Sequence, residues 1–238
     1  MIIRTDDLIH FEIAQQKAFE TLINYSDGIL PIDPFSIINK IQNIKLYTYD
    51  ELAKTIAMEN PDLEIERIRK NFGSDRGFLK MKNGKFILAY NERDPICVIR
   101  WTLFHELGHY FLEHLHEDNT MLGLSEKECE SIHEKEANCF ARHCSSPLPI
   151  VSFFIFKTGG VEFETSSLFM YLFNMGYEAT NNCINHWYNY GNYYHFSDYL
   201  KLVARFEDDL KVKIQKFDFD FMPIYLDKIN KNVFVCTK

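Results

Sequence analysis

The sequence lacks CxxC pairs and any regular cysteine spacing, although it contains 6 Cys among 238 residues. Such spacing is what metal-binding CxxC motifs and disulfide frameworks need, so its absence argues against both. A second zinc site built from Cys129, His133, Cys139 and His143 is disfavoured too, because these residues do not share one helical face. We therefore expect free thiols and a cytoplasmic protein.

Long apolar runs and a targeting segment are also lacking. No apolar run reaches the roughly 18 residues that indicate a membrane-spanning helix. No hydrophobic region precedes a small-residue cleavage site near the N-terminus. We expect a chain that is neither secreted nor membrane-spanning and has no membrane partner. With 46% hydrophobic and 25% charged residues, the composition agrees with a cytosolic enzyme.

Cations are scarce, with 26 Lys and Arg against 34 Asp and Glu, and the net charge is −8. Residues 165–173 and 177–189 have the outline of a helix-turn-helix, joined by 174–176. The second of these helices contains no Lys or Arg and does contain Glu178. Because phosphate contacts need cations, we interpret this region as a packing unit or protein-binding surface and expect no specific nucleic-acid partner.

An HExxH pentapeptide, His105–His109, stands within a long apolar segment. Residues four apart on an α-helix share a face, so the imidazoles of His105 and His109 can reach one metal ion. Glu106 would face the water in an open coordination position and accept its proton. The motif predicts a zinc-dependent peptidase with Glu106 as catalytic base.

The segment around the motif has the pattern of a buried helix. Asp94 and Pro95 are typical of a helix start, as N-cap and first helical residue. Apolar residues then recur nearly all round the helix. Two histidines and a glutamate would be costly there without partners, and a metal ion provides one. The alternative is that they are satisfied core or surface residues.

A third protein ligand must come from another helix. The positions that metzincins would use are Leu112 and Leu115 here, which excludes that class. His114 and His116 do not fit the helical spacing, and we expect them at the surface where the helix ends. Ser125–Glu128 is a capping box that predicts the start of a second helix.

Glu134 and Glu136 of this second helix are the rival third ligands. Glu134 shares a face with Ala137, Asn138 and Ala141. The small alanines let the two helices come close, and Asn138 can hold a ligand histidine from behind. Glu136 points about 160° away, so the two carboxylates cannot serve one ion. We favour Glu134, and Glu136 is the alternative.

The segments around these residues resemble a known family. The run 99–104 leading into HELGHYFLEH, then Glu134–Ala141 and a proline, is similar to the ImmA/IrrE metallopeptidases of bacteria and their mobile elements. That family has a strand, an HELGH helix and a second helix with an ExxAN-x-FA pattern ending in proline. The match covers roughly residues 75–150. Where the family usually reads Leu-Leu-Met-Pro, this chain has Cys144–Pro147, a departure that concerns the wall of the substrate groove.

The resemblance implies a complete site and a biological role. His105 and His109 would be zinc ligands, Glu106 the catalytic base and Glu134 the third ligand. Members of the family often relieve repression by cleaving a helix-turn-helix repressor encoded nearby. The expected partner is therefore a protein substrate, and the expected cofactor is Zn²⁺.

The expected fold is α+β. It has a mainly helical zincin-like (gluzincin) core with a small sheet, over residues 1–150, and an aromatic-rich α/β appendage over 151–238. The appendage would serve packing or protein interaction, and 217–236 alternate like strands. Residues 77–81 and 85–91 flank an Asn-Gly turn and predict a hairpin. We predict 85–91 to be the sheet edge along which an extended substrate adds, with core packing as the alternative. Other expected elements are helices over 8–25, 33–42 and 63–71 and a strand over 44–48.

Three functions of different classes are compatible with these observations. The first is an active zinc endopeptidase that cleaves a regulatory protein. The second is a catalytically idle zinc-containing binding module, such as an antitoxin-like or sensor partner. The third is a DNA-binding regulator with an accidental HExxH. An intact Glu106 favours the first over the second, since a binder needs only the ligands, and the negative charge disfavours the third.

Overall fold

The computed structural model describes residues 9–115, 125–158, 163–190 and 194–216. The chain divides into two compact units, the first from residues 1–17 and 34–141, the second from 18–33 and 142–238. The predicted functional domains, 1–150 and 151–238, stay a prediction. The compact units differ from them in where they place residues 18–33 and 142–150.

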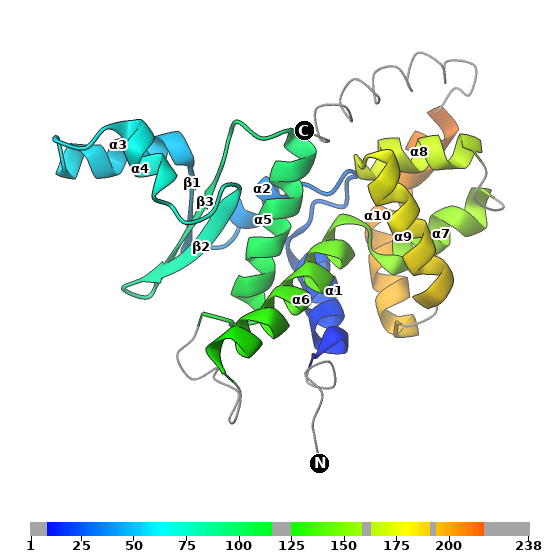
Figure 1. Cartoon of the computed structure of the whole chain (residues 1–238). Coiled ribbons are helices and arrows are strands. Elements are labelled where there is room, and N and C mark those ends of the chain that lie inside the picture. Colours follow the sequence, from blue (N-terminus) through cyan, green and yellow to red (C-terminus); the bar gives the residue numbers. More distant parts are fainter. Residues whose placement is uncertain (1–8, 116–124, 159–162, 191–193, 217–238) are drawn as a thin grey trace. The chain divides into compact units, whose positions relative to one another are not determined.

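The first unit is built on a three-stranded sheet with the order β1-β3-β2 (Figure 1). β1 (Ile44–Thr48) runs parallel to β3 (Lys85–Tyr90), and β2 (Gly77–Lys82) runs antiparallel to it. β3 is thus the central strand, and the prediction that 85–91 form a sheet edge is wrong. Among the described strands the edges are β1 and β2. The described helices of this unit are α2 (Pro34–Asn39), α3 (Tyr49–Glu59), α4 (Ile65–Lys70) and α5 (Ile96–Phe111), with parts of α1 (Phe11–Tyr25) and α6 (Glu126–Ser145).

The turn between β2 and β3 is the predicted Asn83-Gly84 pair. Both residues have positive φ, 54° and 73°. A type I′ hairpin turn needs this conformation at both central positions, and Asn and Gly tolerate it best. The register places Leu79 opposite Leu88, so the predicted hairpin is confirmed.

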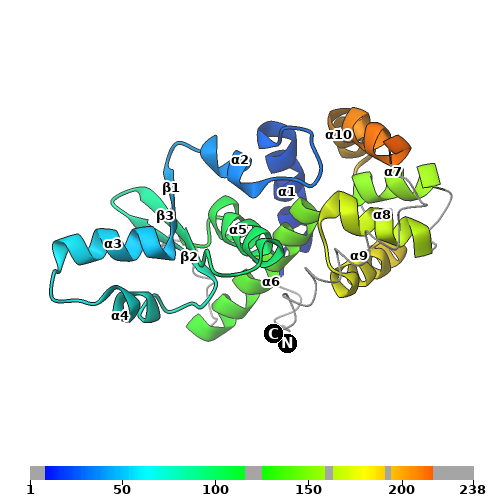
Figure 2. The ribbon, with the colours of Figure 1, turned by 90° about the horizontal axis from the view of Figure 1, so that it is seen from above.

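Both faces of the sheet are covered by helices. Phe78, Ile87 and Ala89 belong to a cluster with residues of α3 and α4. Because side chains alternate along a strand, Leu79 and Leu88 lie on the opposite face, against α5. Figures 1 and 2 both show α5 on one side of the sheet and the α3–α4 pair on the other. The fold therefore presses the HExxH helix against the β2–β3 hairpin.

Helix α3 follows β1 directly. It begins with a capping box, in which Thr48 Oγ1 accepts from Glu51 N–H and the Glu51 carboxylate accepts from Thr48 N–H. Reciprocal bonds of this kind satisfy two of the free N–H groups at a helix start. No helix is expected over these residues from the sequence pattern. The shorter α4 lies within the helix predicted over 63–71.

The described part of the second unit is helical. Its helices are α7 (Leu148–Thr158), α8 (Phe163–Phe173), α9 (Tyr177–Tyr190) and α10 (Phe196–Lys216). α10 packs against α7 and α8. Phe154, Phe169, Phe173 and Phe206 have exposed fractions of 0%, so aromatic rings fill this core. The abundance of aromatics in this part of the chain is therefore largely a packing feature.

The helix-turn-helix outline of the second unit is confirmed as two helices, α8 and α9. Asn174, in the turn, adopts a φ of 49°. The strands predicted over 217–236 lie outside the described residues. The predicted α/β character of the appendage stays a prediction for that reason, while the α+β class of the chain is established by the sheet and helices of the first unit.

One stretch, Lys127–Lys157, is long and apolar enough to cross a membrane by length and composition alone. In the structure 83% of the most apolar 18-residue segment of this stretch is buried inside the protein. The stretch contains most of α6 and α7, and core helices of this kind pass the same test. It is weak support for a membrane span.

The cysteines are mostly free thiols in the described residues. Cys129, Cys139, Cys144 and Cys183 are free. Cys97 is disulfide-bonded. The prediction that the cysteines are free is therefore wrong for Cys97.

Candidate metal centre

His105 and His109 lie one turn apart on α5 and present Nε2 atoms to the same point. The two Nε2 atoms are 3.1 Å apart. Their side chains are 15% and 14% exposed. Leu103, Phe104 and Leu107 of the same helix have exposed fractions of 0%. Burial of these residues fixes the rotation of α5, so both histidines are held on one face.

Glu134, on α6, reaches the same point. Its Oε2 lies 3.3 Å from His105 Nε2, and its Oε1 lies 3.3 Å from His109 Nε2. One donor atom from each of the three residues lies within 4.8 Å of the others. Two imidazole nitrogens and a carboxylate oxygen are a ligand set that zinc accepts in catalytic sites.

Close contact between α5 and α6 brings Glu134 within reach. A Cβ added at Gly108 would lie 3.0 Å from Ala137 Cα and 3.1 Å from Ala137 O. The two helices therefore meet backbone to backbone at this point. The small alanine face of α6 was predictable from the sequence. Gly108, inside the HELGH motif, is the matching small residue on α5, and helical periodicity alone does not reveal its contact with Ala137.

The hydrogen-bond partner of His105 determines its tautomer. His105 Nδ1 lies 3.1 Å from Asn138 Oδ1, as the sequence predicts for an outer partner. An amide oxygen only accepts, so Nδ1 carries the hydrogen and Nε2 keeps its lone pair. That lone pair and the Glu134 carboxylate then face each other as acceptors. A hydrogen on Nε2 relieves this repulsion when no metal is bound, and a metal cation relieves it when the ring is neutral, so the donor set fits Zn²⁺.

Glu136, the rival ligand, lies away from this cluster. Its carboxylate accepts from the backbone N–H of His10 at 2.7 Å and lies 3.0 Å from His114 Nε2. The side chains of His114 and Glu136 are only 3% and 7% exposed. The prediction that His114 is a surface residue is therefore wrong. His116 lies outside the described residues.

The charges of the cluster shift its pKa values. Without a metal ion, hydrogen bonds donated by the rings of His105 and His109 hold the pKa of Glu134 far below its usual range. Burial lowers the pKa of His105, but the hydrogen bond with Glu134 and nearby carboxylate charges raise it overall. Burial raises the pKa of Glu106 to about 7, against the opposing effects of His105 and the Leu79 N–H. A carboxyl group with this pKa can exchange protons at neutral pH.

His105, Glu106, His109 and Glu134 line a cavity of about 460 Å³. Ligand pockets are commonly about 300–1,000 Å³, so the cavity is large enough to receive part of a peptide. Its other lining residues come from the loop before β2, from β2, from α5 and the turn after it, and from α6. They are Ser74, Arg76, Gly77, Phe78, Leu79, Trp101, Thr102, Leu115 and Asn138.

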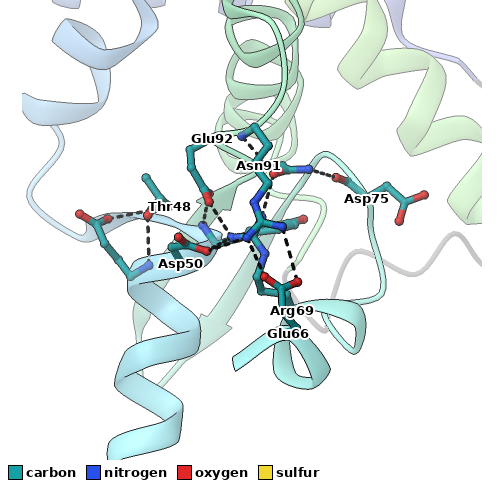
Figure 3. A network of polar contacts seen from close by, with 10 residues as sticks. Thr48, Asp50, Glu66, Arg69, Asp75, Asn91 and Glu92 are labelled. Carbon is teal, nitrogen blue, oxygen red and sulfur yellow. Dashed lines mark hydrogen bonds and ion pairs between the residues drawn. The ribbon is translucent and has the colours of Figure 1, made fainter. Parts of the chain in front are cut away.

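A buried arginine supports the sheet end nearest the loop before β2. The guanidinium of Arg69, on α4, pairs with Asp50 and with Glu92 at 2.6 Å (Figure 3). It also donates to Asn91 Oδ1 at 3.0 Å. Its side chain is only 6% exposed, and removing it would take the paired cation from Glu92 and leave Asp50 with Arg93, which lies 3.6 Å away. The network ties α4 to the start of α3 and to the end of β3.

The same network reaches the cavity wall through the loop before β2. Asn91 Nδ2 donates to Asp75 O at 3.0 Å (Figure 3). The hydroxyl of Tyr49 donates to Ser74 O at 2.9 Å. Ser74 and Arg76 line the cavity. The hydrogen bonds accepted by the Ser74 and Asp75 carbonyl groups therefore hold this loop in place, and the loop forms one wall of the cavity.

No family model, curated protein or solved structure matches the chain. The comparisons thus assign neither a family nor an activity. The functional interpretation depends on the residues themselves: His105, His109, Glu134 and Glu106, and their partners.

Proposed function

We propose that this chain is a zinc metalloendopeptidase of the gluzincin type, similar to the ImmA/IrrE family. Its substrate would be a regulatory protein, such as a helix-turn-helix repressor, in the cytoplasm. The observation that carries the proposal is the convergence of His105, His109 and Glu134 beside Glu106 in one cavity. The zincin-like character of the core is part of this proposal.

His105, His109 and Glu134 would hold the zinc ion. Zinc, when bound, supplies Lewis acidity, which acidifies water and polarises a carbonyl group. The chain's own contribution is orientation. The amide oxygen of Asn138 accepts from His105 Nδ1–H and so fixes the orientation of the ring. The close contact between Gly108 and Ala137 sets how far Glu134 reaches. Ligands held in this way lose little freedom when the ion binds.

Glu106 would act as general base. It lies in the same cavity as the three ligands but is not one of them, so its carboxylate remains available to accept a proton from the attacking water. Burial raises its pKa to about 7, and the Leu79 N–H contact orients it from β2. The proton accepted from water can then be delivered to the leaving amine.

The edge strand β2 would align the substrate. Asn91 N–H donates to Arg76 O at 2.7 Å, which fixes the hydrogen-bonding register of the hairpin. In an antiparallel pair this pattern alternates, so the backbone groups of Gly77, Leu79 and Met81 point away from β3. Gly77 N–H donates to Ser74 Oγ at 3.3 Å and Leu79 N–H to Glu106, so the carbonyl groups of Gly77 and Leu79 and both backbone groups of Met81 are the ones that would meet a substrate. Among the described residues no strand pairs with that side of β2. An extended peptide can add there, next to the cavity.

The decisive experiment combines two measurements on Glu106→Gln. We expect the variant to bind zinc as the wild type does, because the ligands are untouched. Turnover should fall by about 10²- to 10⁴-fold, since a general base contributes that much. The substrate to use is the product of the neighbouring regulatory gene, and cleavage is followed by mass spectrometry of the fragments.

Two outcomes would overturn the proposal. Cleavage undiminished in Glu106→Gln would exclude this residue as the base. Wild-type protein that binds zinc and the regulator but does not cleave it would favour the idle binding module. His105→Ala/His109→Ala is the matched control, because it should lose both metal and activity.

A further inference from the structure

A second group of polar side chains is buried directly behind His109. His114 Nδ1 lies 3.0 Å from His109 Nδ1, and His114 Nε2 lies 3.0 Å from a carboxylate oxygen of Glu136. The ring of His133 stacks on that of His114, with the ring centroids 4.1 Å apart. None of these three residues belongs to the cavity-lining set.

The end of α5 brings His114 back toward His109. Glu113 adopts a left-handed conformation with φ of 60°. His114 N–H then donates to His109 O at 3.1 Å, and Glu113 N–H donates to Tyr110 O at 3.2 Å. This arrangement is the turn that commonly ends helices, although the left-handed position is usually glycine. Five residues apart, the two histidines would not meet on a continuing helix, and the turn makes them neighbours.

The contacts specify where the hydrogens lie. The Glu136 carboxylate can only accept, so His114 Nε2 must carry a hydrogen. A neutral His114 ring then has its lone pair on Nδ1, which accepts from His109 Nδ1–H. His109 Nε2 is left with a lone pair directed at Glu134 and His105. This is the tautomer that a metal ligand needs.

We propose that Glu136 and His114 form a hydrogen-bonded relay that orients His109 and fixes its metal-binding tautomer. Both are positioning residues, and the inference rests on the proposed zinc function. The two histidine ligands are thus held differently, His105 by the amide of Asn138 and His109 by an imidazole backed by a carboxylate. Outer partners of this type typically change metal affinity about 10- to 100-fold when removed.

Two substitutions at His114 separate the two halves of the relay. The amide of Asn reaches about as far as Nδ1 of histidine, and the amide of Gln about as far as Nε2. His114→Asn should therefore keep an acceptor for His109 but lose the bond to Glu136. His114→Gln should keep the bond to Glu136 but lose the acceptor for His109.

The measurements are zinc affinity by competition with a chromogenic chelator, the visible absorption of the cobalt-loaded protein, and thermal stability of the metal-free protein. We expect His114→Gln to weaken zinc binding by about 10- to 100-fold and to alter the cobalt spectrum. His114→Asn should bind zinc more tightly than His114→Gln although its metal-free form is the less stable of the two. A purely structural role would make affinity follow stability instead.

Each result decides between the ideas. Wild-type zinc affinity in both variants, or losses that parallel stability, would overturn the relay while leaving the proposed function intact. Failure of the wild-type protein to bind zinc would refute the proposed function and the relay with it. Glu136→Gln offers a further check, because Gln still accepts from His114 and should therefore lose less affinity than Glu136→Leu.

Discussion

Acid should weaken the second unit through His143. This side chain is only 2% exposed, and its ring packs edge-on against Phe19, with centroids 5.6 Å apart. Burial lowers the pKa of His143 to about 3, and the charges of His186 and Arg142 act in the same direction. The folded protein therefore holds the ring neutral where an unfolded chain would protonate it.

The size of the effect follows from linkage. An unfolded histidine has a pKa near 6.5, so between about pH 6.5 and the folded value the unfolded chain binds more protons. The stability that neutral His143 contributes is present above that range and is lost as pH falls. The loss begins near the unfolded pKa of about 6.5, so roughly 1.5 pH units contribute between pH 7 and pH 5. At about 1.36 kcal/mol per unit, this amounts to about 2 kcal/mol.

Other groups titrate in the same interval, so the wild-type slope alone is no test. Burial lowers the pKa of His186 to about 4, which adds to the acid sensitivity. Burial raises the pKa of Glu106 to about 7, which opposes it, because a carboxyl with a raised folded pKa gains stability as pH falls. The comparison must be between wild type and a variant that differs only at His143.

His143→Gln is that variant, and His143→Phe provides a second non-titrating side chain. Urea unfolding at pH 7 and pH 5, followed by circular dichroism, gives the change in unfolding free energy for each protein. We expect the wild type to lose about 2 kcal/mol more than either variant over this interval. Equal losses in all three would refute the argument, whatever their absolute stabilities.

Three predictions concern the site in the first unit. Glu134→Gln should reduce zinc affinity far more than Glu136→Gln, because only Glu134 faces both histidines; equilibrium dialysis measures this, and the reverse order would make Glu136 the ligand. Gly108→Ala should lower zinc affinity, because the added methyl group pushes α6 and Glu134 away from the histidines. The free energy of unfolding of this variant should fall by about 1–3 kcal/mol through overpacking, partly offset by the higher helix propensity of alanine. Unchanged zinc affinity would show that the helix spacing does not set the reach of Glu134. Met81→Pro should raise KM with little loss of stability, because the N–H of Met81 points away from β3. Lys80→Pro should destabilise the hairpin, because the N–H of Lys80 points toward β3. An unchanged KM in Met81→Pro would exclude β2 as the substrate edge.

The local features of the fold could be predicted from the sequence. The HExxH spacing, the Asn83-Gly84 turn and the Ser125–Glu128 box each depend on residues a few positions apart. In the structure Ser125 donates through both its N–H and its Oγ to the Glu128 carboxylate, at 2.9 and 2.6 Å. Only the Glu128 half of the box is formed, because Glu128 N–H donates to the Ser125 carbonyl oxygen and not to Oγ. The predicted start of α5 was less accurate, since Pro95 rather than Asp94 is the N-cap and no side chain caps it.

Order in the sheet could not be predicted in this way. The hairpin leaves two possibilities open, because either β2 or β3 can take a further partner. β1 joins the β3 side from more than thirty residues away, so a long-range pairing makes β3 central and β2 the edge. Local pattern carries no information about such a pairing, and it cannot show that residues 85–91 form the central strand and not a sheet edge.

The sequence by itself determined that the imidazoles of His105 and His109 share one face of a helix, because the α-helical repeat brings residues four apart together. It also placed the carboxylate of Glu106 one step around the same helix. It also favoured Glu134 over Glu136, since the small residues Ala137 and Ala141 share the face of Glu134 and the two carboxylates cannot serve one ion. Only the tertiary structure decided that Gly108 meets Ala137 and that His114 turns back to His109. The first depends on packing between two helices. The second depends on a left-handed residue that ends α5, and neither follows from helical periodicity.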